Sequence, residues 1–335
     1  MIVTPWTSAQ TCDDFGLTYS EDLYLGRLNT TPTAFTVPEK FNRCYAVLTA
    51  GRADEMLIGL NQAPINFPGT GDPFEQTDTE FLNGRGSICR LLNGGDVLNV
   101  RARSGTFVFG ISFYPEDWGA LPPRNDSGFP FPSMVFSGVV TSTNKTVVVP
   151  DDEEYYYVLF RCSSTNDAYI ALDAEPDIPS GAFTTINSEL INGNQTVCRR
   201  IPGGSVINLK TPTGSVRCAA SFFKPDTNLL QPYLDFGLPM SNLKFGGEIT
   251  STPTNFTVPS DSERYMLVLK VDATNSLYFA INGTPIIANG NFVESDTDFY
   301  NVHNYVCREV RAGDVVSQVK SSGTNLGCAQ LYAIK

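Results

Sequence analysis

Short runs that alternate apolar and polar residues dominate the chain, and turn-forming residues separate them. β-Branched and aromatic residues, the types enriched in strands, fill most of these runs, and Gly, Asn, Asp and Pro fall between them as expected for hairpin turns. In the last third of the chain the expected strands are 245–249, 256–258, 264–271, 277–281, a run near Phe292, 305–310, 315–319 and 327–334. No window keeps a 3.6-residue apolar period, so few helices are expected.

The same order of runs occurs three times. Cys89, Cys198 and Cys307 are 109 residues apart, and each opens the pattern C-R-x-apolar-x-[GA]-G-[DS]-V. Upstream, the F-T-V-P of residues 256–259 matches 35–38 and 147–150. The predicted organisation is an N-terminal arm at 1–13 and three repeats at 14–117, 126–226 and 235–335, joined by short Pro-rich connectors. About eight strands in each repeat predict an all-β chain of three tandem antiparallel β-sandwich domains that are jelly-roll-like.

Charge and composition narrow the classes of function. The chain has 35 Asp and Glu against 23 Lys and Arg, a formal net charge of −12. Such an acidic chain repels phosphate backbones and anionic lipid surfaces, so neither nucleic acid nor membrane is an expected partner. The first residues, MIVTPWTSAQ, lack the pattern of a signal peptide. We therefore expect folding in a cytosol, with most of the eight cysteines as free thiols.

Candidate catalytic and metal-binding residues are scarce. His303 is the only histidine, its counterparts in the other repeats are Arg85 and Asn194, and the chain has no C-x-x-C motif. The expectation is a non-enzymatic protein with no cofactor and no metal. Two cysteine pairs, Cys198 with Cys218 and Cys307 with Cys328, are spaced so that they could face each other on neighbouring strands.

One charged pattern recurs with constant spacing. An acid precedes the Arg of the shared pattern by ten residues in every repeat: Glu80 and Arg90, Glu189 and Arg199, Asp298 and Arg308. Each Arg alternates with apolar residues, so it shares a strand face with them. A buried, unpaired charge costs several kcal/mol, on the order of 3–5 kcal/mol, which predicts a structural acid–Arg pair in each repeat. The alternative is a repeated ligand site, because Arg binds carboxylates and phosphates well.

Aromatic residues supply the candidate partner contacts. Tyr155 and Tyr157 share one face of a predicted strand, and exposed tyrosines favour protein or sugar contacts. Trp6 in the arm and Phe15 just after it are expected either to anchor the chain to a partner or to pack on the first domain.

The repeat also resembles a known class of module. A strand ending in F-T-V-P, an L-Y-F-A-I-N-G hairpin and a Pro/Ala/Gly turn follow one another; the turn segments are 93–95, 202–204 and 311–313. This order is similar to small β-sandwich modules of bacteriophage virion proteins such as head decoration proteins, fibres and spikes. The resemblance implies a structural component of the virion, assembled in the host cytoplasm, whose partners are capsid or tail proteins.

Two questions stay open at this stage. The alternative function is a receptor- or glycan-binding module of a phage tail or spike. Three linked copies are compatible with a pseudo-threefold cluster, with extended beads and with self-association into a homo-oligomer, because linked surfaces add their contacts through effective concentration.

Overall fold

The computed structural model describes an all-β chain. The described residues are 22–50, 55–64, 74–82, 87–116, 129–162, 166–193, 196–225, 237–271, 277–287, 297–300 and 305–334. Strands are the only regular elements among them, and almost every pairing is antiparallel. No helix in these ranges is long and apolar enough to cross a membrane.

Repeat 1 is a sandwich of two sheets. Sheet 1a contains β1 (Asp22–Leu28), β9 (Phe107–Pro115), β3 (Arg43–Ala50) and β7 (Ser87–Asn93). Sheet 1b contains β2 (Thr33–Thr36), β8 (Val97–Ala102), β4 (Met56–Leu60) and β6 (Thr79–Leu82). Counted along the repeat, β1, β9, β3 and β7 are the first, eighth, third and sixth of these eight strands. They face β2, β8, β4 and β6, which are the second, seventh, fourth and fifth. This is the strand order of a jelly roll, two Greek keys folded into two sheets.

Repeats 2 and 3 have the same strand order. Sheet 2a contains β11 (Met134–Thr141), β19 (Ser215–Phe223), β13 (Tyr155–Cys162) and β17 (Thr196–Pro202), and sheet 2b contains β12 (Lys145–Val148), β18 (Val206–Lys210), β14 (Ala168–Leu172) and β16 (Glu189–Ile191). Sheet 3a contains β20 (Leu243–Ile249), β27 (Asn325–Ile334), β22 (Arg264–Val271) and β25 (Tyr305–Arg311), and sheet 3b contains β21 (Thr254–Thr257), β26 (Val315–Lys320), β23 (Leu277–Ile281) and β24 (Thr297–Tyr300). Each sandwich closes over its own apolar core.

The shared Gly turn has a direct structural reason. Gly95, Gly204 and Gly313 all have φ near +80° (85°, 78° and 82°), a conformation that glycine adopts without strain. In repeats 1 and 2 a second glycine precedes it and faces a backbone carbonyl: a Cβ would lie 2.0 Å from the oxygen of Phe41 at Gly94 and 2.2 Å from that of Glu153 at Gly203. The paired glycines therefore allow two chain segments to approach closely at the end of the first two sandwiches, whereas repeat 3 has Ala312 at this position.

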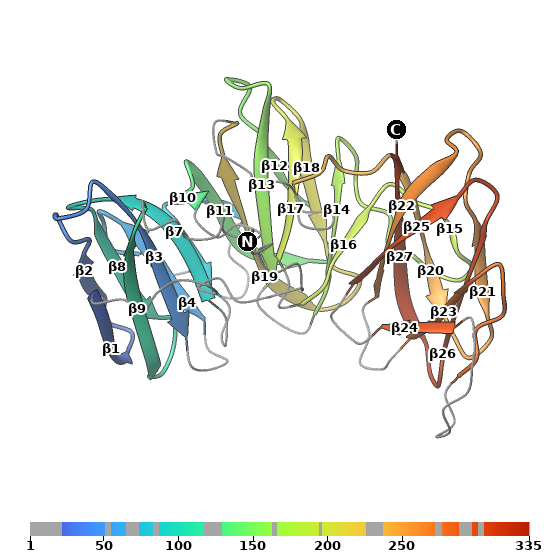
Figure 1. Ribbon diagram of the computed structural model, residues 1–335, viewed down its shortest axis with the longest axis horizontal. Helices are drawn as coiled ribbons and strands as arrows, with labels where there is room; N and C mark the ends of the chain where they lie inside the picture. The colour runs from blue at the N-terminus through green and yellow to red at the C-terminus, as the bar shows by residue number, and fades with distance from the viewer. Residues whose placement is uncertain are drawn as a thin grey trace, which may run out of the picture.

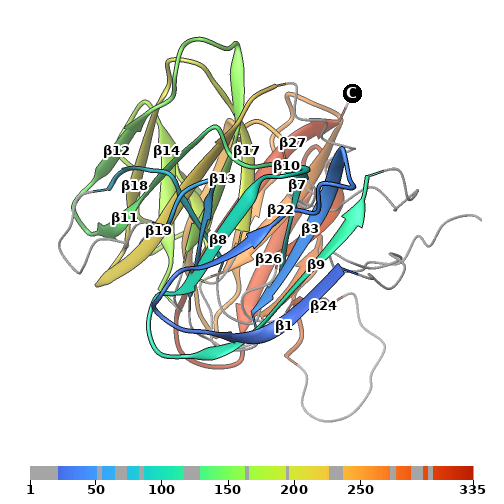
Figure 2. The same ribbon diagram turned by 90° about the vertical axis from the view of Figure 1, so that its left-hand side faces the viewer.

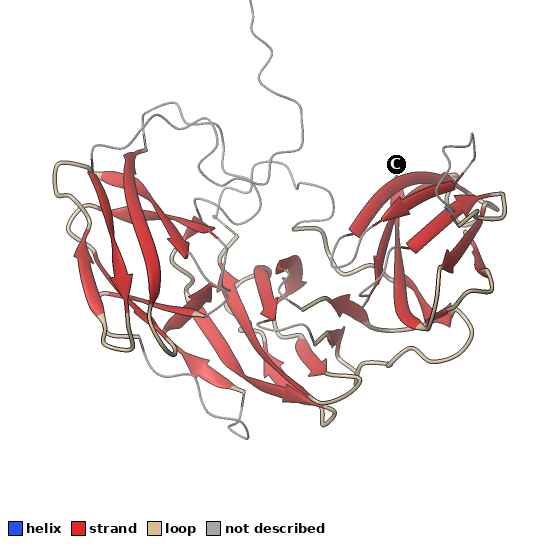
Figure 3. Ribbon diagram, turned by 90° about the horizontal axis from the view of Figure 1, so that it is seen from below, coloured by secondary structure: helices blue, strands red, loops and turns tan. Residues whose placement is uncertain are grey.

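The three repeats form an arc with repeat 2 in the middle (Figures 1 and 3). Short strands cross between them. β5 (Glu75–Thr77) precedes β6 in the chain but pairs with β11, and β15 (Thr184–Thr185) pairs with β20 in the same way. Segments at the start of repeats 2 and 3 also pair back onto the preceding repeat. β10 (Phe129–Pro130) pairs in parallel with β7 of repeat 1, and Pro239 forms a parallel bridge to Arg200 of β17 in repeat 2. The repeats are thus paired with one another in an arc, neither extended as separate beads nor gathered in a pseudo-threefold cluster.

The cysteine pairs suggested by spacing do not form. β13 lies between the strands of Cys198 and Cys218, and β22 lies between those of Cys307 and Cys328. Cys218 instead faces Cys162 across β13 and β19, with 2.9 Å between the two Sγ atoms, and neither forms a disulfide. Burial raises the pKa of Cys162 well above its usual range, which keeps this thiol protonated and slow to react.

Candidate functional site

The acid and Arg of each predicted pair lie together in all three repeats. In repeat 1, Arg90 Nε donates to Glu80 Oε2 at 2.9 Å, and Nη2 donates to Oε1. Arg199 Nε donates to Glu189 Oε2 at 2.9 Å in repeat 2, again with Nη2 on Oε1. Both pairs are fully buried. Each pair links the two sheets of its sandwich, because β6 and β16 carry the acid while β7 and β17, in the facing sheet, carry the Arg.

A second cation reaches each buried pair from the following repeat. Arg161 of repeat 2 donates from Nη1 to Glu80 Oε1 at 2.8 Å. Lys270 of repeat 3 donates from Nζ to Glu189 Oε1, also at 2.8 Å. Arg161 and Lys270 hold the same position on β13 and β22, the last but one of each strand. The sequence pattern predicted the two-residue pair but not this third member, whose only signal is a basic residue recurring within an apolar run.

The Coulomb balance of the buried cluster favours the ionised acid. Burial alone would raise the pKa of Glu189, but the charges of Arg199 and Lys270 outweigh it and hold that pKa well below its usual range. The acid with its two cations is therefore a charged cluster at the junction, and removing the acid leaves two buried cations without a compensating charge.

The pair of repeat 3 differs in its surroundings. Arg308 contacts Asp298 through Nη2, yet the two side chains are 45% and 43% exposed. The expectation that each Arg is buried on an apolar face is therefore wrong for Arg308. The reason is that repeat 2 covers Glu80 and repeat 3 covers Glu189, whereas the third pair is open to solvent.

Apolar contacts surround the charged clusters. Between repeats 1 and 2, the outer faces of sheets 1b and 2a bury a cluster of Leu57, Phe81, Val135 and Ala219. Between repeats 2 and 3, the equivalent faces of sheets 2b and 3a bury a cluster of Tyr169, Ile186, Leu190 and Cys328. Since sheet 1b meets sheet 2a and sheet 2b meets sheet 3a, the six sheets stack in the order 1a, 1b, 2a, 2b, 3a, 3b.

A phenylalanine from each of the first two repeats enters the next core. Phe74 belongs to the core cluster of repeat 2. Phe183, 109 residues later, packs against the core of repeat 3, and its ring stacks on Phe256 with the centroids 5.6 Å apart. Gly247 permits this approach, because a Cβ there would lie 2.6 Å from Phe183 Cα. Each junction therefore combines strand addition, an inserted aromatic ring and a buried charged cluster.

The candidate aromatic contacts lie beside these junctions. The rings of Tyr155 and Tyr157 meet edge to face with their centroids 5.5 Å apart, and the Arg200 guanidinium lies 5.3 Å from the Tyr155 ring centroid. Both tyrosines are half-buried and Arg200 is exposed. Burial, followed by the neighbouring Tyr155, raises the pKa of Tyr157 to about 12. Trp6, Phe15 and His303 lie outside the described residues.

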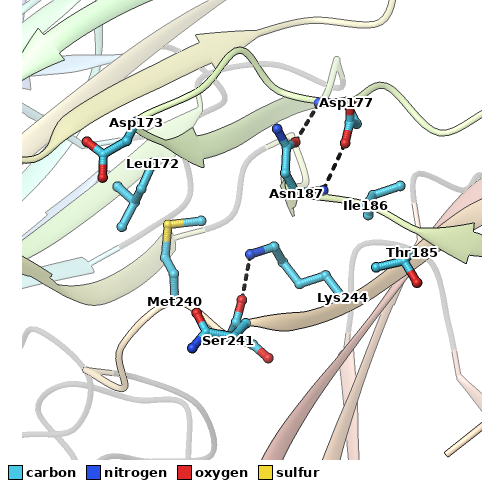
Figure 4. Close-up of a pocket in the computed structure, with 10 residues that line it drawn as sticks. Leu172, Asp173, Asp177, Thr185, Ile186, Asn187, Met240, Ser241 and Lys244 are labelled. Carbon is cyan, nitrogen blue, oxygen red and sulfur yellow. Dashed lines mark hydrogen bonds between the residues drawn. The ribbon is translucent and has the colours of Figure 1, made fainter. Parts of the chain in front are cut away.

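A cavity of about 590 Å³ opens between repeats 2 and 3. Its lining includes Asp177 and Asn187, which bond each other through two backbone N–H groups, and the mostly buried Lys244 (Figure 4). Lys244 Nζ donates to the carbonyl of Ser241 at 2.5 Å, and burial lowers its pKa. In the described part of the chain, no group of three or more His, Cys, Asp or Glu is arranged to hold a metal ion.

Comparison with known proteins leaves the chain without a family. No protein-family model matches it, and no curated protein matches it significantly. Among the solved structures that are weakly similar to the chain are the following three. A cupin 2 conserved barrel domain protein from Leptotrichia buccalis has 6% identity and a TM-score of 0.23 over 59% of this chain and 82% of its own. The structure of the lipid-containing bacteriophage PM2 has 10% identity and a TM-score of 0.18 over 92% of this chain and 99% of its own. The vicilin from Solanum melongena has 11% identity and a TM-score of 0.17 over 59% of this chain and 73% of its own. Scores this low carry no argument about function, so the jelly-roll assignment rests on the strand order alone.

Proposed function

We propose that this chain is a non-enzymatic structural component of a phage virion, which decorates or stabilises the capsid or forms a head fibre or collar. The construction of its two junctions carries the proposal. Each junction joins two jelly rolls through an added strand, an inserted ring and a buried acid with two cations. Contacts of these kinds hold separate subunits together in assemblies, and here they hold covalently linked repeats in one arc.

The fold is compatible with this role. Jelly rolls occur in viral capsid proteins, and also in lectins and cupins, so the site and not the fold decides between functions. The supporting features are mechanical: buried, directional ion pairs set the register of one repeat on the next, and edge strands of neighbouring repeats are covered by pairing. A stiff arc of this kind presents three related surfaces at set positions, which suits a regular shell.

The direct test is co-sedimentation of the purified chain with phage particles that lack it. Saturable binding at a fixed number of copies per particle is the expected result, and the number separates shell decoration from a place at a single vertex or on the tail. Absence of binding to particles, at protein concentrations well above those needed for saturation of typical complexes, contradicts the proposal.

The alternative function is a receptor- or glycan-binding module, and the Tyr155–Tyr157–Arg200 cluster is the observation that favours it. Two tyrosines in edge-to-face contact with a nearby guanidinium are suited to the apolar faces and hydroxyls of a sugar ring. On this alternative, Tyr155→Ala abolishes binding on a glycan array or to bacterial cells. Tyr24→Ala, which removes an exposed tyrosine of repeat 1 outside the cluster, leaves that binding intact.

A further inference from the structure

The stack of six sheets has two end faces, the outer face of sheet 1a and the outer face of sheet 3b. Strand pairing shows how sheet 1a corresponds to the covered sheet 2a. Leu23 pairs with Ser112 as Val135 pairs with Ser221, and Leu25 pairs with Gly110 as Ser137 pairs with Ala219. The end face of repeat 1 is thus the counterpart of the face of sheet 2a that repeat 1 covers at the first junction.

This end face of repeat 1 is apolar and exposed. Leu25 is 77% exposed and Leu23 is 45% exposed, whereas their counterparts Ser137 and Val135 are each 1% exposed. Val108, two residues before Gly110 on β9 and so on the same face, is 47% exposed. Figure 2 looks onto this end of the molecule, where β1, β9 and β3 lie side by side. Exposed apolar side chains gathered on one face mark an interaction site.

The end face of repeat 3 has the complementary features. Tyr278 holds the position that Leu57 and Tyr169 hold at the two junctions and is half-buried. Ile286, at the position of the cavity-lining Asp177, is 52% exposed. The Asp298–Arg308 pair, whose counterparts are buried at the junctions, is open to solvent. Among the described residues, the exposed large hydrophobic side chains are Leu23, Tyr24, Leu25, Val108, Val148 and Ile286, and all except Val148 belong to the two end repeats.

We propose that copies of this chain associate head to tail, with the outer face of sheet 3b of one copy packed on the outer face of sheet 1a of the next. The occupant is a second copy because this contact continues an interface that the chain already makes twice, with the same pair of faces in the same order. Such a contact is heterologous, so successive copies either close into a ring or extend into a filament. The association goes beyond the role in a virion and can be measured on the purified chain.

Repeat 1 differs from repeats 2 and 3 at two positions of this face, and both differences make the contact between copies weaker than the internal junctions. Thr49 stands on β3 where Arg161 and Lys270 stand on β13 and β22, so no cation reaches the acid of the preceding copy from this position. Phe109 fills the core of repeat 1 at the position of Gly327, beside which the Phe183 ring packs in repeat 3. Copies therefore meet through their outer faces, without an inserted ring, and the association is reversible and dependent on concentration.

The first test is sedimentation velocity of the full chain over a range of concentrations. We expect a monomer that associates as its concentration rises. Leu25→Lys places a charge on the contact face and should weaken association about tenfold or more. Val148→Lys is the matched control, because Val148 is 62% exposed on repeat 2 and away from both end faces; it should leave association unchanged. A chain that stays monomeric at every concentration, or equal effects of the two variants, overturns the proposal.

The second test restores the missing cation. Thr49→Arg should strengthen association about fivefold by giving Asp298 of the neighbouring copy the partner that Glu80 and Glu189 have at the junctions. Combining Thr49→Arg with Asp298→Asn should remove that gain, while Asp298→Asn alone should change association little. A gain that survives Asp298→Asn would mean that the copies meet elsewhere, and the head-to-tail geometry would be wrong.

Discussion

Glu189 and Asp298 hold the same position in successive repeats, and their surroundings give them different energetic roles. Glu189 is fully buried between Arg199 and Lys270, while Asp298 is open to solvent. Removing one partner of a buried ion cluster costs about 3–5 kcal/mol, and an exposed pair contributes about 0–1 kcal/mol. We expect Glu189→Gln to lower the free energy of unfolding by the first amount and Asp298→Asn by the second. Urea unfolding measures both; similar losses would contradict the assignment of the junction cluster.

The same carboxylate predicts how stability depends on pH. The pKa of Glu189 in the folded chain lies well below its usual range, which in an unfolded chain is about 4.3. A group whose pKa is lowered by folding contributes its full stability above the unfolded pKa and loses it as pH falls toward the folded pKa. We therefore expect the melting temperature to fall below about pH 4. The melting temperature of the Glu189→Gln variant should approach that of the wild type as the pH falls through the same interval. A difference in melting temperature that stays constant with pH would exclude Glu189 as the source of the pH dependence.

At the scale of the elements, the strands within a repeat were predictable and those between repeats were not. Alternating apolar runs located the core strands, and the ten-residue spacing brought Glu80 opposite Arg90 because two consecutive strands of the repeat, β6 and β7, carry them. The crossing strands β5, β10 and β15 are only two or three residues long, too short to show a period. Their partners lie in another repeat, so no local pattern reports them. The cysteine pairing failed for a related reason: spacing does not tell which strand lies between two others.

Gly247 tests the importance of strand addition. Its equivalents are Gly138 and Gly26, and at Gly26 on the open edge of β1 an added Cβ would meet nothing within 4 Å. Gly247→Ala must push β20 and the Phe183 backbone apart, since the Cβ would lie 2.6 Å from Phe183 Cα. We expect faster amide hydrogen exchange at 182–186 and a loss of about 1–3 kcal/mol of stability. Gly26→Ala, the matched control, should leave both nearly unchanged, and comparable losses in the two variants would contradict this role.

At the scale of the whole molecule, the inserted rings decide whether the repeats unfold together. Repeats that contact only their neighbours have stabilities set by each unit and by each interface, so a strong interface couples their unfolding. Phe183 contributes a ring of repeat 2 to the core of repeat 3, which makes it a member of both units. The intact chain should therefore show one cooperative transition in calorimetry.

Phe183→Ala should break that coupling. Truncating a packed phenylalanine costs about 3–5 kcal/mol, and here the loss falls on the interface between repeats 2 and 3. We expect the calorimetric transition to split, with repeat 3 unfolding first and becoming sensitive to limited proteolysis while repeats 1 and 2 stay protected. Phe35→Ala is the control, because Phe35 packs against the core of its own repeat; it should lower the stability of repeat 1 without separating repeat 3 from repeat 2. A single transition in Phe183→Ala would mean that the charged cluster and the added strand couple the repeats without the ring.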